Sequence, residues 1–96
     1  MQASNELETR RRRALYRACH RGTKELDLIL GRFAQDRVTQ MSEEVLDRFE
    51  RLLALPDPDI ESWVLHAEAG ENAPDDLESL VEQLRHFHGL GNKGSG

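Results

Sequence analysis

The spacing of its apolar residues is the feature that most constrains what this chain can fold into. They recur three or four positions apart in short blocks, and the clearest block is Leu26, Ile29, Leu30 and Phe33. This spacing places apolar side chains on one face of an α-helix, whereas a half-buried strand would need strict alternation. The sequence also has no Asn-Gly or Asp-Gly pair, the strongest short hairpin signal. We therefore predict an all-α fold.

Five helices are expected, at about residues 6–19, 23–35, 43–54, 58–67 and 74–88. Short connections between amphipathic helices favour antiparallel neighbours, so the sequence predicts a small antiparallel bundle around one core. We expect a single domain over residues 1–88, a loop at 68–74, and a disordered Gly-rich tail at 89–96.

Each expected helix has a set of inward-facing residues and, in two cases, a recognisable start. The inward sets are Leu7, Ala14, Leu15, Ala18 and Cys19; Leu26, Ile29, Leu30 and Phe33; Val45, Phe49, Leu52 and Leu53; Ile60, Trp63 and Val64; and Leu77, Leu80, Val81, Leu84 and Phe87. Ser42 is the expected N-cap of the third helix. Asp57 is the expected N-cap of the fourth helix, with Pro58 at its first position.

Length and charge narrow the class of protein. The 96 residues carry a net charge of -5, yet residues 1–24 hold seven Arg or Lys against two Glu, so the basic and acidic parts are separated. The single cysteine excludes an intramolecular disulfide. No apolar run of about 18 residues exists, so we expect no membrane insertion. The N-terminal sequence predicts a cytoplasmic protein, and the mitochondrial matrix is the alternative if the chain is processed.

Catalytic and metal-binding motifs are absent from the sequence. It contains no His-Glu-x-x-His and no Gly-rich phosphate loop, so we predict neither an enzyme nor a metal site. The basic run Arg10–Arg13 with Arg17 suggests an alternative, a small nucleic-acid-binding or antitoxin-like helical regulator. A pI near 5.3 argues against nucleic acid, because nucleic-acid modules tend to be basic.

The stretch "CHRGTKELDLIL" interrupts the helical pattern with Arg21 and Gly22. As a simple joint, Gly22 would either end the first helix or be the N-cap of the second. With Gly22 as N-cap, Glu25 would be the third residue of the second helix, reaching back as in half of a capping box. Arg21 would then lie at the end of the first helix, where the dipole favours a cation. As an alternative, an Arg and a Glu side by side on a joint make a contact patch for a partner.

The joint contains an Arg-Gly-x-x-Glu motif, formed by Arg21, Gly22 and Glu25. In this motif the chain resembles the SdhE-type flavinylation factors. In mitochondria these factors are known as succinate dehydrogenase assembly factor 2. Tyr16 and Arg17 before the motif, and Leu26 and Asp27 after it, also fit. A second block, "DPDIESW" at residues 57–63, resembles the family's Asp-Pro-Asp element. The resemblance covers about residues 10–87.

The resemblance implies a bundle of about five helices that binds the flavoprotein subunit of succinate dehydrogenase and promotes covalent attachment of FAD to a histidine of that subunit. It extends the expected partners to fumarate reductase, and it implies an assembly chaperone that holds no cofactor tightly, with direct FAD binding left open. The expected partner-binding residues are Arg21, Gly22, Glu25, Tyr16, Arg17, Asp27 and Asp59.

Overall fold

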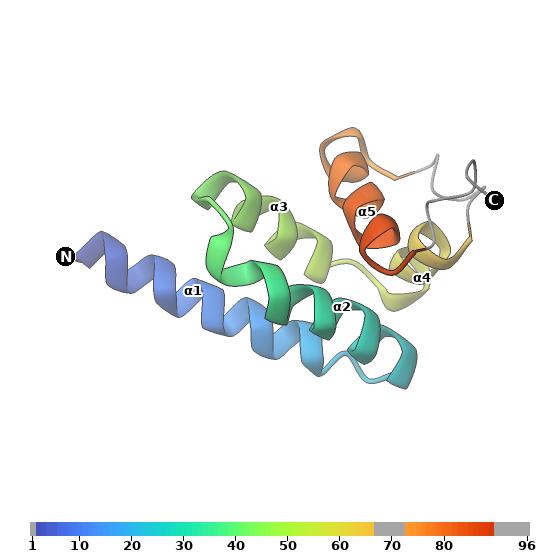
Figure 1. Ribbon diagram of the computed structural model, residues 1–96, viewed down its shortest axis with the longest axis horizontal. Coiled ribbons are helices and arrows are strands. Elements are labelled where there is room, and N and C mark those ends of the chain that lie inside the picture. The colour runs from blue at the N-terminus through green and yellow to red at the C-terminus, as the bar shows by residue number, and fades with distance from the viewer. Residues whose placement is uncertain (1, 67–72, 90–96) are drawn as a thin grey trace.

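The computed structural model describes residues 2–66 and 73–89 of the chain (Figure 1). Its elements are α1 (Gln2–Cys19), α2 (Lys24–Arg37), the short 3-10 helix η1 (Val38–Gln40), α3 (Glu43–Leu53), α4 (Asp57–Leu65) and α5 (Asp75–Phe87). The described residues contain no strand, and the predicted all-α fold is confirmed. The helix η1 was not predicted. Most of the expected 68–74 loop and of the 89–96 tail lies outside the described residues.

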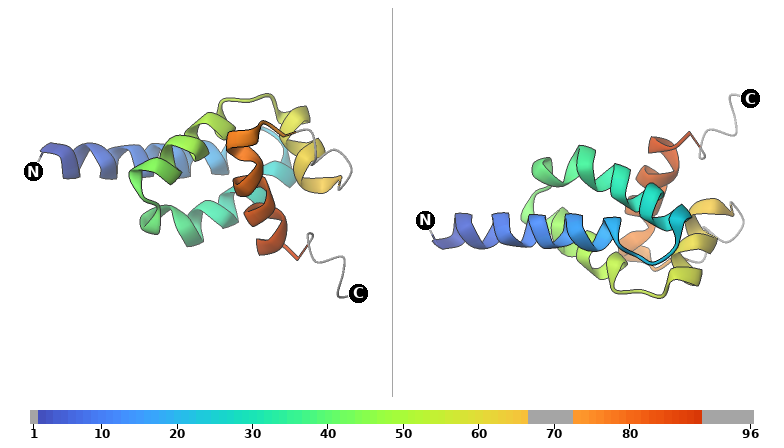
Figure 2. Two further views of the ribbon diagram at one scale, coloured as in Figure 1. Left: turned by 90° about the horizontal axis from the view of Figure 1, so that it is seen from above. Right: turned by 90° about the horizontal axis from the view of Figure 1, so that it is seen from below.

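The helices form a small bundle in which α1 lies along the longest dimension (Figure 1). The second helix, α2, runs back beside α1, and α3 packs against the same helix. Helices α4 and α5 lie at the end of the bundle where α1 meets α2, while the start of α1 projects beyond the other helices (Figure 2). None of the helices, within the residues described, is both long and apolar enough to cross a bilayer.

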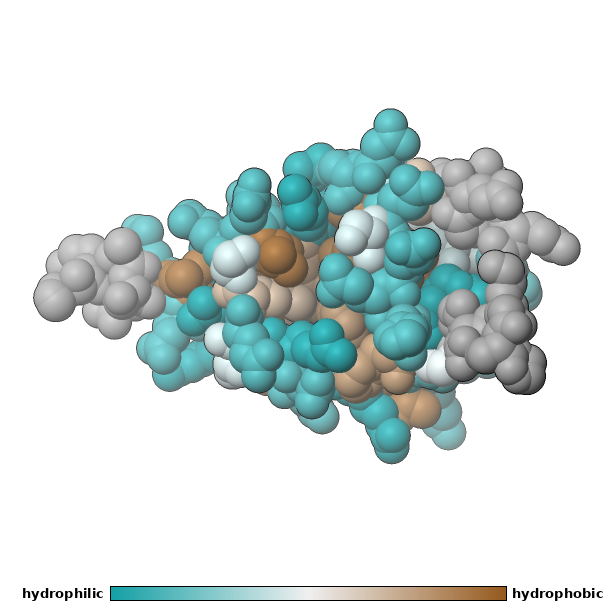
Figure 3. Space-filling model, turned by 45° about the horizontal axis from the view of Figure 1, so that its top comes forward, coloured by the Kyte–Doolittle hydropathy of each residue, from teal (hydrophilic) through white to brown (hydrophobic). Residues whose placement is uncertain are grey.

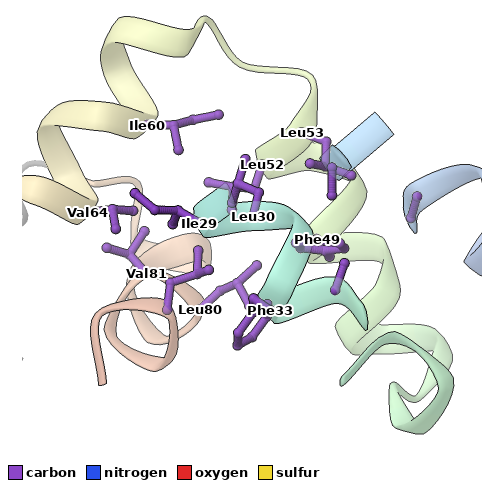
Figure 4. Close-up of a cluster of buried hydrophobic side chains, with 14 of the residues drawn as sticks. Ile29, Leu30, Phe33, Phe49, Leu52, Leu53, Ile60, Val64, Leu80 and Val81 are labelled. Atoms are coloured by element: carbon purple, nitrogen blue, oxygen red, sulfur yellow. The ribbon is translucent and has the colours of Figure 1, made fainter. Parts of the chain in front are cut away.

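The core lies between α2, α3 and the α4–α5 pair (Figure 4). Phe33 and Phe49 are its largest fully buried side chains, and their rings lie 6.0 Å apart between centroids. Hydrophilic residues predominate on the face in Figure 3, and apolar residues show between them near the middle of this face. Burial of apolar surface of this kind is the main favourable term in folding.

The predicted inward residues need a few corrections. Near the start of α3, Leu46 is buried, whereas Val45 is only half-buried. Val45 packs against the core from the predicted side of α3, and the prediction missed Leu46, its neighbour on the helix, because only packing decides which of the two is more deeply buried. Four other predicted inward residues are half-buried and pack against the core: Leu7, Leu15, Trp63 and Phe87. Cys19 on α1 is also half-buried.

One of the two predicted N-caps is confirmed. Ser42 caps α3, since its Oγ accepts a hydrogen bond from the backbone N–H of Val45 at 3.2 Å. The prediction of Asp57 as the N-cap of α4 was wrong: Pro56 is the N-cap, Asp57 comes first in the helix and Pro58 second. The Asp57 carboxylate is instead engaged by a guanidinium from elsewhere in the chain.

Gly31 sets the close approach of α1 and α2. A Cβ at this buried position would lie 3.1 Å from Cys19 Sγ and 3.5 Å from Cys19 Cα. We expect Gly31→Val to force the two helices apart and to lower the free energy of unfolding by about 1–3 kcal/mol. Urea denaturation followed by circular dichroism measures this change.

The control for Gly31→Val is Arg32→Val, which places the same side chain at the next, exposed position of α2. Apart from the small change in helix propensity, Arg32→Val should change the free energy of unfolding by no more than about 0.5 kcal/mol. Equal denaturation midpoints for the two variants would contradict the close packing of α1 on α2 at Gly31.

Candidate interaction site

The connection between α1 and α2 is a tight corner. Gly22 has φ of 110°, a conformation that L side chains rarely adopt. Thr23 is the N-cap of α2, and its Oγ1 accepts a hydrogen bond from the N–H of Leu26 at 3.2 Å. The predictions of Gly22 as N-cap and of Glu25 at the third helical position were therefore wrong. Gly22 supplies the reversal of the chain, and the next residue caps the helix.

The carboxylate of Asp27 holds this corner from inside the first turn of α2. Its Oδ1 accepts hydrogen bonds from the backbone N–H of Arg21 at 2.5 Å and of Gly22 at 3.2 Å. Hydrogen bonds to an ionised acceptor are stronger than neutral ones. Asp27, one of the residues expected to bind a partner, thus fixes the backbone on which the others are mounted.

The guanidinium of Arg21 is turned toward the protein, and its side chain is only 10% exposed. Its Nε and Nη2 donate to Oδ1 of Asp57 at 3.0 and 2.6 Å. Nη2 also donates to the carbonyl of Leu55 at 2.9 Å, and Nη1 donates to the carbonyl of Leu53. We expected Arg21 to meet acceptors on a partner, but all three acceptors of these four hydrogen bonds belong to this chain.

The hydrogen bonds of Arg21 join three parts of the fold. Leu53 is the last residue of α3, where a cation also opposes the negative end of the helix dipole. Asp57 is the first residue of α4. The α1–α2 corner is thereby tied to the α3–α4 connection, and the first turn of α4, with the exposed Asp59, is held beside it.

Tyr16 and Arg17 extend the site along α1, and both are exposed. The ring of Tyr16 stacks on the imidazole of His20 with centroids 4.1 Å apart. Nδ1 of His20 lies 2.8 Å from the carbonyl oxygen of Tyr16, so this nitrogen carries a proton and donates. The stack restricts the Tyr16 ring on the surface.

The seven expected partner-binding residues thus divide into two sets. Those on the surface are Tyr16, Arg17, Gly22, Glu25 and Asp59, whereas Arg21 and Asp27 hold the corner. Sequence reasoning missed the role of Asp57 as the partner of Arg21, because no local signal connects residues 36 positions apart.

Two arginines in the Arg-rich part of α1, Arg10 and Arg11, are held by acceptors of the chain itself. Arg10 donates to Glu50 at 2.9 and 3.1 Å, to Asp47 at 2.5 Å and to Glu43 at 3.5 Å. The hydrogen bonds that Arg10 donates to Glu50 and then to Asp47 raise the pKa of its guanidinium, so it stays charged. Arg11 donates to the carbonyl of Met41 at 2.8 Å.

The site offers binding groups rather than reactive ones. Its exposed set consists of a phenol, a guanidinium, two carboxylates and the bare backbone of a glycine. Within residues 2–66 and 73–89, no three His, Cys, Asp or Glu residues form a group that could hold a metal ion. Such a surface binds by hydrogen bonds, charge and close approach.

Comparison with known proteins gives consistent matches. The model of a family described as flavinator of succinate dehydrogenase matches residues 12–88. FAD assembly factor SdhE of Acetobacter pasteurianus is 40% identical over 62 residues, covering 65% of this chain and 57% of that protein. The mitochondrial succinate dehydrogenase assembly factor 2 of Dictyostelium discoideum is 36% identical over 84 residues, and that of Yarrowia lipolytica 37% over 82. These alignments cover 88% and 83% of this chain, and 57% of each relative.

Proposed function

The chain belongs to the family of flavinators of succinate dehydrogenase, and from this premise we propose that it is an assembly factor that binds the flavoprotein subunit of that enzyme and promotes covalent attachment of FAD to it. Relatives matched over most of this chain are named as assembly factors, which supports a role in assembly rather than an enzymatic one. Fumarate reductase, which resembles succinate dehydrogenase in chemistry, is a second proposed client.

The exposed corner carries this proposal. Gly22 and Glu25 of the family motif lie on the surface, while Arg21 anchors the corner from within. We infer that Gly22 permits close approach of the partner's backbone and that Glu25 meets a donor or a cation on the flavoprotein. Tyr16, Arg17 and Asp59 extend the contact on either side, and Arg21 and Asp27 act as positioning residues.

The mechanism is a shift in the population of partner conformations. Covalent attachment requires a histidine of the flavoprotein and the reacting carbon of the flavin to be held in near-attack geometry. A factor that binds more tightly to the arrangement with this geometry increases its population. The bond itself then forms on the flavoprotein, and the factor supplies no reacting group.

We place the FAD on the partner and propose no tight flavin site in this chain, since its sequence has no phosphate-binding loop. The matched relatives include a bacterial protein and two mitochondrial ones. The proposed compartment is accordingly the bacterial cytoplasm or the mitochondrial matrix.

Glu25→Ala tests the surface role of the corner. Glu25 is exposed, and among the described residues nothing holds its carboxylate, so we expect less than about 0.5 kcal/mol change in stability. We expect flavinylation to fall at least about tenfold, equivalent to one lost charged contact. The measurement is in-gel flavin fluorescence of the flavoprotein band in a deletion strain carrying each variant.

The control is Glu44→Ala, which removes an exposed carboxylate from α3, also in the first turn of its helix. Flavinylation should stay at the wild-type level with this variant. A flavin band that is unaffected by deletion of the gene would overturn the proposed function, and a Glu25→Ala band equal to wild type would remove Glu25 from the contact.

A further inference from the structure

The described residues expose two large hydrophobic side chains, and both lie on the α1–α2 hairpin. Tyr16 on α1 is 64% exposed and Leu28 on α2 is 54% exposed. Leu28 does not belong to the apolar stripe of its helix and is not part of the Arg-Gly-x-x-Glu motif. Tyrosine is enriched at interface hot spots, and exposed apolar side chains that gather in one patch mark interaction sites.

The two side chains flank the same seam. This seam is the line of contact between α1 and α2 at Cys19. The Sγ of Cys19 would lie 3.1 Å from a Cβ added to Gly31 on α2. It also accepts a hydrogen bond from Nε2 of Gln35 at 3.9 Å. Tyr16 lies three residues before Cys19, and Leu28 lies three residues before Gly31 and seven before Gln35. Such spacings keep residues on one side of a helix.

The outer side of this hairpin is open to solvent. Helices α1 and α2 run side by side in both views of Figure 2. The core-facing residues of α1 and α2 include Ala14, Ala18 and Leu30, which lie on the other side of each helix from Tyr16 and Leu28. An approaching partner can therefore touch both exposed side chains at once.

Three cations lie at helical spacing from the apolar pair, and one exposed carboxylate, Glu25, lies three residues before Leu28. Arg12 and Arg13 lie four and three residues before Tyr16, and Lys24 lies four residues before Leu28, which makes them surface neighbours. All three are exposed, and in the part of the chain that the structure describes no carboxylate pairs with them. In contrast, Arg10 and Arg21 are occupied by carboxylates of the chain itself.

We propose that these five residues, Tyr16 and Leu28 bordered by Arg12, Arg13 and Lys24, form a docking face for an apolar patch of the flavoprotein that is bordered by carboxylates. The inference rests on the proposed function and adds to it Leu28, Arg12, Arg13 and Lys24, which the motif does not include. The apolar pair slows dissociation, and the cations accelerate association by steering. The acidic remainder of the chain disfavours docking of such a partner elsewhere.

Leu28→Gln tests the apolar anchor. It keeps a side chain of similar length and good helix propensity at an exposed position. Against the purified flavoprotein subunit immobilised on a biosensor, we expect the dissociation rate to rise at least about tenfold with little change in association rate. The matched control is Glu82→Gln, an exposed position on α5 away from the hairpin, which should bind as wild type does.

Arg12→Glu combined with Arg13→Glu tests the cationic border. We expect the association rate to fall about tenfold at low salt and the difference from wild type to shrink as salt is raised, because exposed charges are screened. Arg48→Glu on α3 is the control for a change of charge alone.

The outcomes separate the docking face from the proposed function. If wild type binds the flavoprotein and Leu28→Gln and the double Arg variant bind equally well, the docking face is wrong and the proposed function stands. If wild type does not bind, both are wrong. A third outcome would also overturn the docking face. If wild type bound duplex DNA or RNA in a salt-sensitive way, and the double Arg variant lost this binding but still bound the flavoprotein, the cations would serve nucleic-acid binding instead.

Discussion

Arg21→Ala is expected to lower the free energy of unfolding by about 3 kcal/mol and to abolish flavinylation of the partner. The stability loss follows from four hydrogen bonds made by a charged group that is 10% exposed, to Asp57 and to the carbonyls of Leu53 and Leu55. Small domains have only about 5–15 kcal/mol of stability, so this loss is large yet leaves a folded protein.

The loss of flavinylation is expected because the corner is no longer held beside the first turn of α4. Asp57→Ala should reproduce both effects, although Asp57 is the anchor of Arg21 and not an expected partner contact. The double variant should cost little more stability than either single one, since each substitution removes the same interaction. Urea denaturation gives the free energies, and in-gel flavin fluorescence with purified components gives the activity at a temperature where each variant is folded.

The control for the charge is Arg48→Ala, which removes a half-buried arginine on α3 that makes no hydrogen bond or ion pair among the described residues. It should retain flavinylation. If Arg21→Ala abolished flavinylation without a change in stability, and Asp57→Ala kept it, Arg21 would act on the partner directly, and the positioning role would be wrong.

Gly22→Leu is expected to abolish flavinylation while the helical circular dichroism signal is retained. Gly22 has φ of 110°, so any other residue is strained there, at a cost of about 1–3 kcal/mol. A Cβ at Gly22 would meet no atom within 4 Å, so the cost is conformational and not a clash inside the protein. The added side chain would instead project from the exposed corner into the partner.

Gly22→Ala separates backbone strain from bulk. It imposes the same restriction on φ and should cost about the same stability, but it projects only a methyl group. We expect partial flavinylation with alanine and none with leucine. Equal activities of the two variants would show that strain, and not contact with the partner, explains the effect, and a collapsed helical signal in both would make the corner a purely structural joint.

The secondary structure of this chain is largely a local property. The spacing of Leu26, Ile29, Leu30 and Phe33 was enough to predict α2, and Ser42 was enough to predict the start of α3, because helix periodicity and capping depend on residues within one or two turns. Leu46 was missed, and Asp57 was wrongly predicted as an N-cap, where neighbouring positions were equally suitable by local criteria.

The identity of the family was also readable from the sequence, because the Arg-Gly-x-x-Glu motif and the block at residues 57–63 lie in one small chain. The roles within the motif were not readable. Arg21 and Glu25 are both polar residues four positions apart, and the sequence assigned both to the partner. The structure turns Arg21 inward and leaves Glu25 exposed.

By itself, then, the sequence determined the five α-helices found in the described residues, the family, and the corner at Gly22. Only the tertiary structure decided that Arg21 pairs with Asp57 and that Arg10 is held by carboxylates of α3 while Arg12 and Arg13 are exposed. It also decided that Tyr16 and Leu28 remain exposed on two helices that pack together. The physical reason is the distance along the chain over which each effect acts. Periodicity and capping depend on residues within one helix, whereas these pairings depend on how separate helices pack.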